Sequence, residues 1–333
     1  MKTLVLRLFD NLNIFRFFNR YTSNTATVFM MHNIKRENED DGGHLSSETL
    51  RNYFAYLKQH NYNVISLSDY IAALRGKKSI SKTVVFTVDD GYRDFYFNAF
   101  PVFREYDFPA TVFLTSDFIE KKIFLWWDLI EFIITETKSR EIDLSFMGLD
   151  NFSLNGKNDR FRAIDLIVGR LKKVPDEAKL EITERLTNRL KVDISDQPEG
   201  KYAPLTWDEI LEMHRCGIEF YPHTKTHPIM TRINYEQKLT ELIESKNILE
   251  KKLNGNLDIF CYPNGGRGDF DDETIMALKE TGYNAAVTGI AGFDSTKSET
   301  DFFKIHRYGI PLDTAIFKQY ISGLEYLKYK YLY

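Results

Sequence analysis

Cysteine is scarce in this sequence, with two residues among 333. Cys216 and Cys261 lie far apart in the chain, and neither belongs to a C-x-x-C pair. A disulfide-stabilised scaffold and a cysteine-ligated zinc knuckle are therefore excluded. We expect both thiols to be free and buried, in a protein of a reducing compartment.

An excess of positive charge is also lacking. Lysine and arginine contribute 44 residues and aspartate and glutamate 48, which gives a formal net charge of −4. No overall positive field is available to attract the phosphates of a nucleic acid. Nucleic-acid binding is thus excluded as the main role.

Long hydrophobic runs are missing as well. The apolar clusters at residues 4–9 and 14–18 are separated by Asp10 and Asn11 and include Arg16. They are too short and too polar for a signal-peptide core or a spanning helix, so we expect a cytoplasmic protein. Residues 1–25 form an amphipathic segment that either packs on the domain, which we favour, or makes a peripheral contact with a membrane surface.

The sequence does contain enough apolar residues for a large core, at 43% hydrophobic and 14% aromatic. Apolar runs alternate with helix-favouring segments along the chain. We predict strands over residues 27–32, 62–67, 83–88, 110–115, 218–222, 257–262, 284–288 and 302–306. Because many of these runs are apolar on both faces, they indicate parallel strands covered by helices in one α/β domain with an insertion.

Capping residues mark the predicted helices. Ser68 is predicted to cap a short helix over 69–74, and Thr206 with Glu209 forms a capping box. A longer amphipathic helix is predicted over 235–253, with Gly255 beyond its end.

The alternation stops between residues 121 and 204, where the sequence becomes charged and helix-favouring. We predict a helical insertion over this segment. Trp126 and Trp127 at its start either anchor a core, which we favour, or offer a flat apolar surface on which a sugar ring can stack.

Polar residues follow the predicted strands at their C-terminal ends. They are Asp89, Asp90, His223, Asn264 and His306, with His227 four residues after His223. In a barrel of parallel strands these ends converge at one mouth. Two imidazoles and a carboxylate are a common ligand set for a hydrolytic divalent metal, and of two adjacent carboxylates one can bind the metal while the other takes a proton.

These residues occur in motifs that resemble those of the polysaccharide deacetylases, the family with the NodB-homology domain. Residues 87–92, Thr-Val-Asp-Asp-Gly-Tyr, are similar to the family's Thr-Phe-Asp-Asp-Gly motif, and residues 223–227, His-Thr-Lys-Thr-His, are similar to its His-Ser/Thr-x-x-His motif. Further similarities lie at residues 31–34, 260–265, 284–288 and 303–307. The resemblance covers about residues 27–311, apart from 121–204.

The resemblance implies a distorted (β/α)7 TIM-like barrel of the NodB-homology type over residues 26–320, with the helical insertion at 121–204 and a C-terminal tail at 321–333. It implies hydrolysis of the N-acetyl, less often O-acetyl, group of a sugar. The substrate would be a carbohydrate, either a surface polysaccharide or its precursor.

The resemblance also implies roles for individual residues. Asp90, His223 and His227 would bind a divalent metal, for which Zn2+ is the first choice and Co2+, Mn2+ or Ni2+ also fit. Asp89 would be the general base. The backbone amide of Asn264 would help to hold the tetrahedral oxyanion.

The sequence departs from the family pattern at two places. Cys261 occupies a position where the family often has an arginine that orients the base, and Arg307 can supply that charge instead. The general acid is usually a histidine in a Leu-x-His motif near the end of the barrel. We assign this role to His306, with His32 as the rival.

Two other functions stay open. The same scaffold can hydrolyse a different non-peptide C–N bond, such as a formamide or a cyclic amide, or it can be a catalytically silent carbohydrate-binding protein. The presence of Asp89 beside the metal ligands argues against the silent binder, which has no need of a base.

Overall fold

The computed structural model describes residues 2–36 and 45–332. Its centre is a parallel sheet with the order β12-β1-β5-β6-β9, in which β4 also pairs with β5. The strands are β1 (Ala26–Met31), β4 (Asn63–Val64), β5 (Thr83–Val88), β6 (Thr111–Leu114), β9 (Glu219–Pro222) and β12 (Tyr308–Gly309). A second parallel pair, β10 (Ile259–Cys261) with β11 (Ala285–Val287), lies next to β9. The strands form a distorted (β/α)7 barrel, which confirms the predicted fold class.

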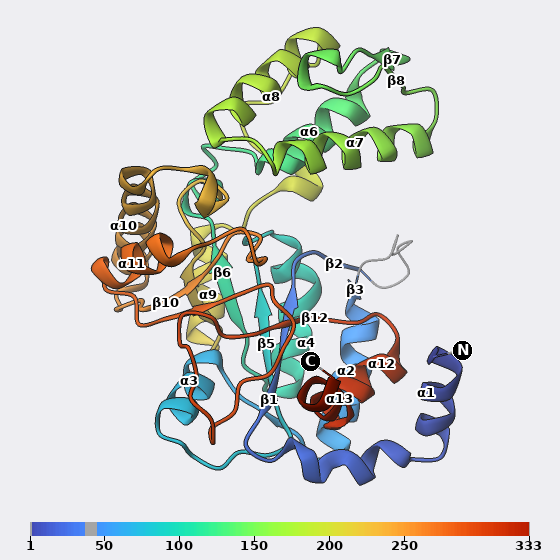
Figure 1. The fold of residues 1–333 in the computed structure, drawn as a ribbon, viewed down its shortest axis with the longest axis vertical. Helices are drawn as coiled ribbons and strands as arrows, with labels where there is room; N and C mark the ends of the chain where they lie inside the picture. The colour runs from blue at the N-terminus through green and yellow to red at the C-terminus, as the bar shows by residue number, and fades with distance from the viewer. Residues whose placement is uncertain (1, 37–44, 333) are drawn as a thin grey trace.

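Helices surround these strands (Figure 1). They are α2 (Ser47–Gln59), α3 (Leu67–Arg75), α4 (Phe100–Tyr106), α5 (Ser116–Ile119), α9 (Trp207–Arg215), α10 (Tyr235–Leu253), α11 (Asp272–Glu280), α12 (Thr314–Ile321) and α13 (Leu324–Leu332). A turn of π-helix, η2 (Phe95–Ala99), precedes α4. Two short strands, β2 (Ile34–Lys35) and β3 (Leu45–Ser46), pair in parallel beside them.

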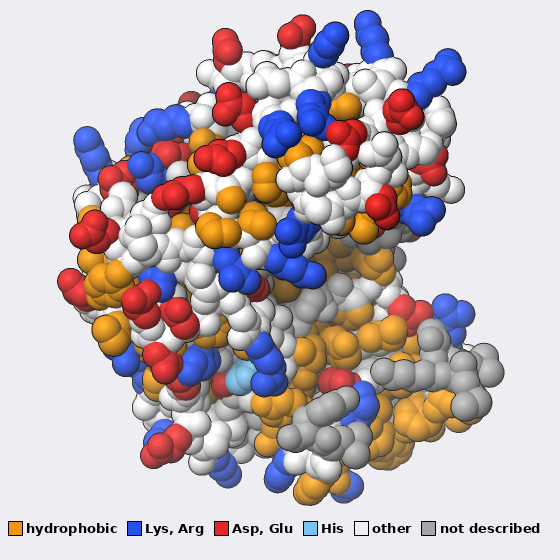
Figure 2. All heavy atoms as spheres, turned by 45° about the horizontal axis from the view of Figure 1, so that its top comes forward, with side chains coloured by type: hydrophobic (Ala, Val, Ile, Leu, Met, Phe, Trp, Pro, Cys, Tyr) orange, Lys and Arg blue, Asp and Glu red, His pale blue; other side chains and the backbone are white. Residues whose placement is uncertain are grey.

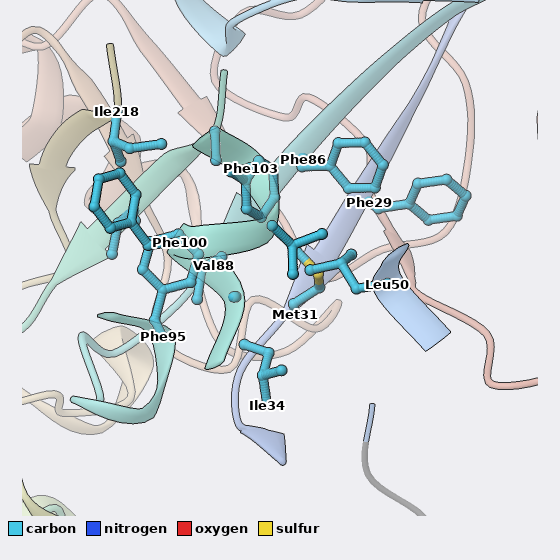
Figure 3. Packing of buried hydrophobic residues seen from close by; sticks show 14 of the residues in the cluster. Phe29, Met31, Ile34, Leu50, Phe86, Val88, Phe95, Phe100, Phe103 and Ile218 are labelled. Atoms are coloured by element: carbon cyan, nitrogen blue, oxygen red, sulfur yellow. The ribbon is translucent and has the colours of Figure 1, made fainter. Parts of the chain in front are cut away.

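Aromatic side chains fill the core between the central strands and the helices. Phe29 of β1 and Phe86 of β5 are fully buried, and their rings stack with centroids 5.8 Å apart. Phe103 of α4 meets the Phe86 ring edge-on at 5.7 Å. Figure 3 shows how side chains from these elements gather in one cluster. All six residues of β5 are buried, as expected for a parallel strand covered on both faces.

Several predicted elements are confirmed, and two boundaries are wrong. Residues 83–88 and 235–253 coincide with β5 and α10, and the capping box at Thr206 is present. However, Ser66 rather than Ser68 caps α3, because the Ser66 hydroxyl accepts the Asp69 amide at 3.1 Å. The strand predicted to reach residue 67 therefore ends at Val64. The polar stretch at residues 35–43, which the sequence marks as a loop after the first strand, lies mostly outside the described residues.

The predicted last strand at 302–306 is also wrong. Carboxylates take two of its amides: Asp301 accepts from Phe303 at 3.0 Å, and Asp294 accepts from His306 at 2.9 Å. One parallel bridge, Val287 to Ile305, remains, and the strand that joins the sheet is β12, which follows directly.

The insertion forms a lobe above the barrel (Figure 1). It contains α6 (Trp126–Glu136), α7 (Lys157–Leu171), α8 (Asp176–Leu190) and the antiparallel pair β7 (Glu141–Ile142) and β8 (Phe152–Ser153). Its buried apolar residues form a cluster separate from the barrel core. The chain returns to the barrel beside the loop that follows β5 (residues 89–91), where the Leu205 amide donates to Gly91 O at 2.9 Å. The lobe is thus attached to the loop that carries the candidate base.

The N-terminal segment packs against the barrel: α1 (Lys2–Asn11) lies beside α12, and η1 (Ile14–Thr22) lies beside α13. Within the described part of the chain, no helix has the length and apolarity needed to cross a membrane. The two thiols are free, as expected. The expectation that both are buried is half wrong, because Cys216 follows the end of α9 and is exposed, whereas Cys261 is buried.

Candidate active site

The loop after β5 turns sharply and buries both aspartates. Asp90 has a φ of 74° and Gly91 a φ of 92°. A Cβ atom on Gly91 would come within 2.8 Å of Leu114 Cδ2, so this position requires glycine. Asp89 and Asp90 are 3% and 2% exposed, and the turn directs them to different partners.

Asp90 meets the two predicted histidine ligands. Its Oδ1 atom lies 3.5 Å from His223 Nε2 and 3.4 Å from His227 Nε2, and the two Nε2 atoms are 3.1 Å apart. Ligand atoms about a tetrahedral ion with bonds of about 2.0–2.1 Å are spaced by roughly 3.3 Å. These three residues therefore fit a divalent metal without rearrangement.

The two histidines differ in protonation. Although burial opposes it, the charges and hydrogen bonds of Cys261, Asp90 and Asp89 raise the pKa of His223, so a metal would have to displace its Nε2 proton. His223 Nδ1 lies 2.8 Å from Cys261 O, and an N–H at this position donates to the carbonyl and leaves Nε2 facing Asp90. Burial lowers the pKa of His227 to about 4, and the neighbouring His223 adds to this effect. The His227 imidazole is therefore neutral at pH 7, as metal ligation requires.

A second group with ligand atoms close together, Asp89, His223 and Cys261, fits a metal less well. Both oxygens of Asp89 already accept from Arg307. Burial raises the pKa of the Cys261 thiol, so a thiolate is disfavoured. A buried guanidinium at this point would also repel a cation, and the set around Asp90 is the better site.

Arg307 holds Asp89 in a bidentate ion pair, with Nη1 to Oδ1 at 2.7 Å and Nη2 to Oδ2 at 2.9 Å. The guanidinium is 1% exposed and also donates to Thr288 O and Thr87 Oγ1. Burial by itself would raise the pKa of Asp89, but Arg307 outweighs this effect and lowers it below its ordinary value. Arg307 therefore lies beside Asp89, in the place expected for the family's arginine at the position that Cys261 occupies here.

The two candidate acids lie in different places. His32, which directly follows the end of β1 at Met31, lines the cavity, and its Nε2 is 3.8 Å from Asp89 Oδ2. His306 is absent from the described cavity lining, and its Nδ1 is 3.0 Å from Asp294 Oδ1. Of the two candidate acids, the structure brings His32 to the cavity and places His306 outside its described lining, paired with Asp294.

Asn264 lies at the end of β10, where it lines the cavity with a φ of 59°. The following Gly265 also has a positive φ, of 69°, and a Cβ atom there would lie 2.5 Å from Gly289 N. Among the described residues, the Asn264 amide has no hydrogen-bond acceptor. It is available to a substrate oxygen.

A cavity of about 380 Å³ joins these residues. Figure 2 shows the molecule hollowed on its right-hand side, between the insertion above and the barrel below. The barrel contributes the polar floor. The insertion contributes apolar side chains, Trp126, Trp127, Ile164 and Val168, and the charged side chains of Glu131, Asp165 and Lys172. Such a combination is typical of a pocket for a small organic group.

Sequence reasoning missed a hydrogen-bonded chain beside this cavity. Trp127 Nε1 donates to Tyr92 Oη at 3.1 Å, and Tyr92 donates to Asp128 Oδ2 at 2.7 Å. The Trp127 ring also lies 4.5 Å from the His227 ring. Trp126 is buried in the insertion core, as favoured, and Trp127 packs partly against the same core; both line the cavity, and Trp127 also contacts the His227 ring. No local pattern signals this arrangement, since Asp128 is 36 residues from Tyr92.

We expect Asp128→Asn to become more stable relative to the unsubstituted protein as the pH rises. Burial, aided by Asp90, raises the pKa of Asp128 from 3.8 to about 8. Folding therefore takes up a proton between these values, and the native protein loses stability as the pH rises from about 4 to about 8. Asparagine removes this dependence. The difference in unfolding free energy should grow by on the order of a few kcal/mol across that range.

Urea unfolding with a chelator present, at several pH values, measures this difference. The exposed Asp150→Asn is the matched control and should show little change. A difference that stays constant with pH for Asp128→Asn would contradict the assignment of a proton to this carboxyl group.

A distorted barrel with adjacent aspartates and a His-x-x-x-His pair at its mouth defines a class of barrel hydrolases. The chain belongs to the polysaccharide deacetylase family, whose model matches residues 76–159 and 172–286, more than half of the chain.

Two curated relatives are similar in sequence. YxkH of Bacillus subtilis (strain 168), which is named among the polysaccharide deacetylases, is 20% identical over 276 residues, or 82% of this chain and 68% of that protein. The poly-beta-1,6-N-acetyl-D-glucosamine N-deacetylase of Escherichia coli (strain K12) is 34% identical over 89 residues. This match covers 26% of the chain and only 13% of the E. coli protein.

Solved structures share the fold. The Streptococcus pyogenes deacetylase PplD, in complex with acetate, has a TM-score of 0.58 at 19% identity, covering 92% of this chain and 97% of its own. IcaB from Ammonifex degensii has a TM-score of 0.57 at 14% identity, with coverage of 90% and 97%. Because the sequence identities are this low, the structural similarity shows a common architecture and nothing beyond it.

Proposed function

We propose that this protein removes the acetyl group from an N-acetylated sugar of a polysaccharide or of its precursor, in a metal-dependent hydrolysis. One observation carries the proposal: Asp89, held by Arg307, lies in the same cavity as the three converging ligand atoms of Asp90, His223 and His227. A buried carboxylate base beside a metal site is the arrangement that metal-dependent hydrolases use to activate water.

The comparisons support this substrate class. The E. coli relative is named for deacetylation of a polymer of N-acetylglucosamine, and PplD was solved with acetate, the acid that deacetylation releases. The half-buried Trp127 ring in the cavity wall offers a flat apolar face for a pyranose ring. A sugar stacked there would lie close to His227.

The chain's own residues divide the work. Asp90, His223 and His227 would hold a divalent ion, for which zinc is the first choice. When bound, the ion would supply Lewis acidity to the attacking water and to the acetyl carbonyl. Asp89 accepts the proton of the water, and Arg307 keeps this carboxylate ionised and oriented.

The other two residues act on the oxygen and on the leaving group. The amide of Asn264 donates to the oxyanion of the tetrahedral intermediate. His32 donates a proton to the departing amine, and it suits this role because it lines the cavity and its side chain is 47% exposed to solvent.

Acetate release tests the proposal. The metal-free protein is reconstituted with zinc, cobalt, manganese or nickel and incubated with N-acetylhexosamine oligomers and with lipid-linked and nucleotide-linked precursors. Loss of one acetyl group, seen by mass, is expected. A protein with intact Asp90 and one equivalent of metal that releases no acetate from any of them would refute it. Cleavage of a formamide or cyclic amide would indicate the other C–N hydrolase, and failure to hold metal would indicate a silent binder.

We expect His32→Ala to lower kcat about 100-fold or more, and His306→Ala to change it by less than about tenfold, because only His32 can reach a leaving group in the cavity. Steady-state kinetics with soluble oligomers measures both variants, and circular dichroism checks that each is folded. Larger losses in His306→Ala than in His32→Ala would return the acid role to His306.

A further inference from the structure

Helix α1 and the segment after it turn apolar side chains toward solvent. Val5, Leu8, Leu12 and Phe17 are 46%, 54%, 59% and 63% exposed. We refer to these four residues as the outward patch. Val5 and Leu8 lie on one side of α1 at i and i+3, and Leu12, directly after the last helical residue, Asn11, continues the spacing at i+7. Figure 1 shows α1 at the periphery of the molecule, away from the insertion.

The opposite side of α1 is tied to the barrel through charged residues. Arg7 Nη2 lies 3.2 Å from Asp313 Oδ2, and Lys318 Nζ lies 2.6 Å from Asp10 Oδ1. Leu6 is buried between these contacts. Leu6 also packs in an apolar cluster with Phe15 and Ala315, so ion pairs and apolar contacts together anchor this side of the helix, while Val5 and Leu8 on the other side remain uncovered. A helix that only packed on the domain would be expected to turn these side chains inward.

The exposed charge beside the outward patch is positive. Arg16 and Arg20 are both exposed, and each lies over the ring of its neighbour, Phe17 at 5.4 Å and Tyr21 at 4.8 Å. Among the described residues, no carboxylate is within ion-pair distance of either guanidinium. The acidic residue of α1, Asp10, is already paired. A local positive charge therefore accompanies the patch on a chain whose net charge is −4.

We propose that the outward patch, with Arg16 and Arg20, docks the protein on an anionic lipid bilayer. The aliphatic side chains and Phe17 would enter the interface between headgroups and acyl chains, and the two guanidinium groups would bind lipid phosphates. Because the chain as a whole is acidic, this surface would also determine which side of the protein faces the lipid. The proposal concerns a surface outside the catalytic cavity, so it stands or falls separately from the proposed function.

Vesicle flotation tests this docking. The full chain is mixed with vesicles of equal parts phosphatidylglycerol and phosphatidylcholine, or of phosphatidylcholine alone. Binding to the anionic vesicles is expected and should weaken with salt. Leu8→Gln/Phe17→Gln and Arg16→Gln/Arg20→Gln should each weaken it by about tenfold or more. Leu180→Gln/Met276→Gln, at side chains 62% and 58% exposed on α8 and α11, is the matched control and should bind normally.

Acetate release from a soluble oligomer should be the same in all these variants, which separates docking from catalysis. Three outcomes would overturn the proposal. The first is that the wild-type protein does not float with the anionic vesicles. The second is that the control variant loses vesicle binding as much as the patch variants do. The third is that sedimentation shows a dimer that Leu8→Gln/Phe17→Gln dissociates, because the patch would then bind a second copy of the chain.

Discussion

The Asp89→Asn variant should keep one equivalent of divalent metal and lose acetate release by about 10²–10⁴-fold. Asp89 contributes no ligand atom to the set around Asp90, because both of its oxygens accept from Arg307. Asparagine retains the size of the side chain but cannot take a proton from water. The expected loss is therefore in kcat, with metal content unchanged, measured by steady-state kinetics and elemental analysis of the same preparation.

Asp90→Asn is the matched control one residue along the same loop. It removes the carboxylate whose Oδ1 lies 3.5 and 3.4 Å from the two histidines, so it should lose metal and activity together. Equal metal loss in Asp89→Asn and Asp90→Asn would refute the division of the two carboxylates into base and ligand.

The second large effect is expected from His223→Ala, which should reduce bound metal from one equivalent to less than about a tenth. The His223 imidazole is 1% exposed and its Nε2 lies 3.5 Å from Asp90 Oδ1, so alanine leaves only Asp90 and His227 of the three converging ligands. Acetate release should fall to the background of the assay. Removal of metal should also lower the melting temperature of the wild-type protein, but not that of the variant.

The stability that the protein gains by binding the metal has a known order of magnitude. A ligand present at 100 times its Kd stabilises the native state by about 2.7 kcal/mol, and His223→Ala should lose this gain. His306→Ala, a histidine outside the cavity lining, should keep both the metal and the thermal shift. Thermal unfolding with and without chelator makes the comparison, and a full metal complement in His223→Ala would exclude this residue as a ligand.

Much of the candidate site could be predicted because its key residues directly follow apolar strands. Asp89 and Asp90 end β5, and His223 ends β9, so their positions depend on the local chain and on the convergence of parallel strands. The metal identity, the cytoplasmic location and the domain boundaries remain predictions. None of these three properties is set by the residues that directly follow a strand.

By itself, the sequence predicted most of the strands from apolar periodicity, and its resemblance to the polysaccharide deacetylases implied the barrel class and the ligand set Asp90, His223 and His227. Only the tertiary structure decided which histidine lies in the cavity, which arginine holds Asp89 and which tryptophan contacts the His227 ring. Arg307 is 218 residues from Asp89, and Trp127 reaches His227 from the insertion. Such contacts depend on how loops and lobes pack in space, because no periodicity of the chain encodes the distance between them.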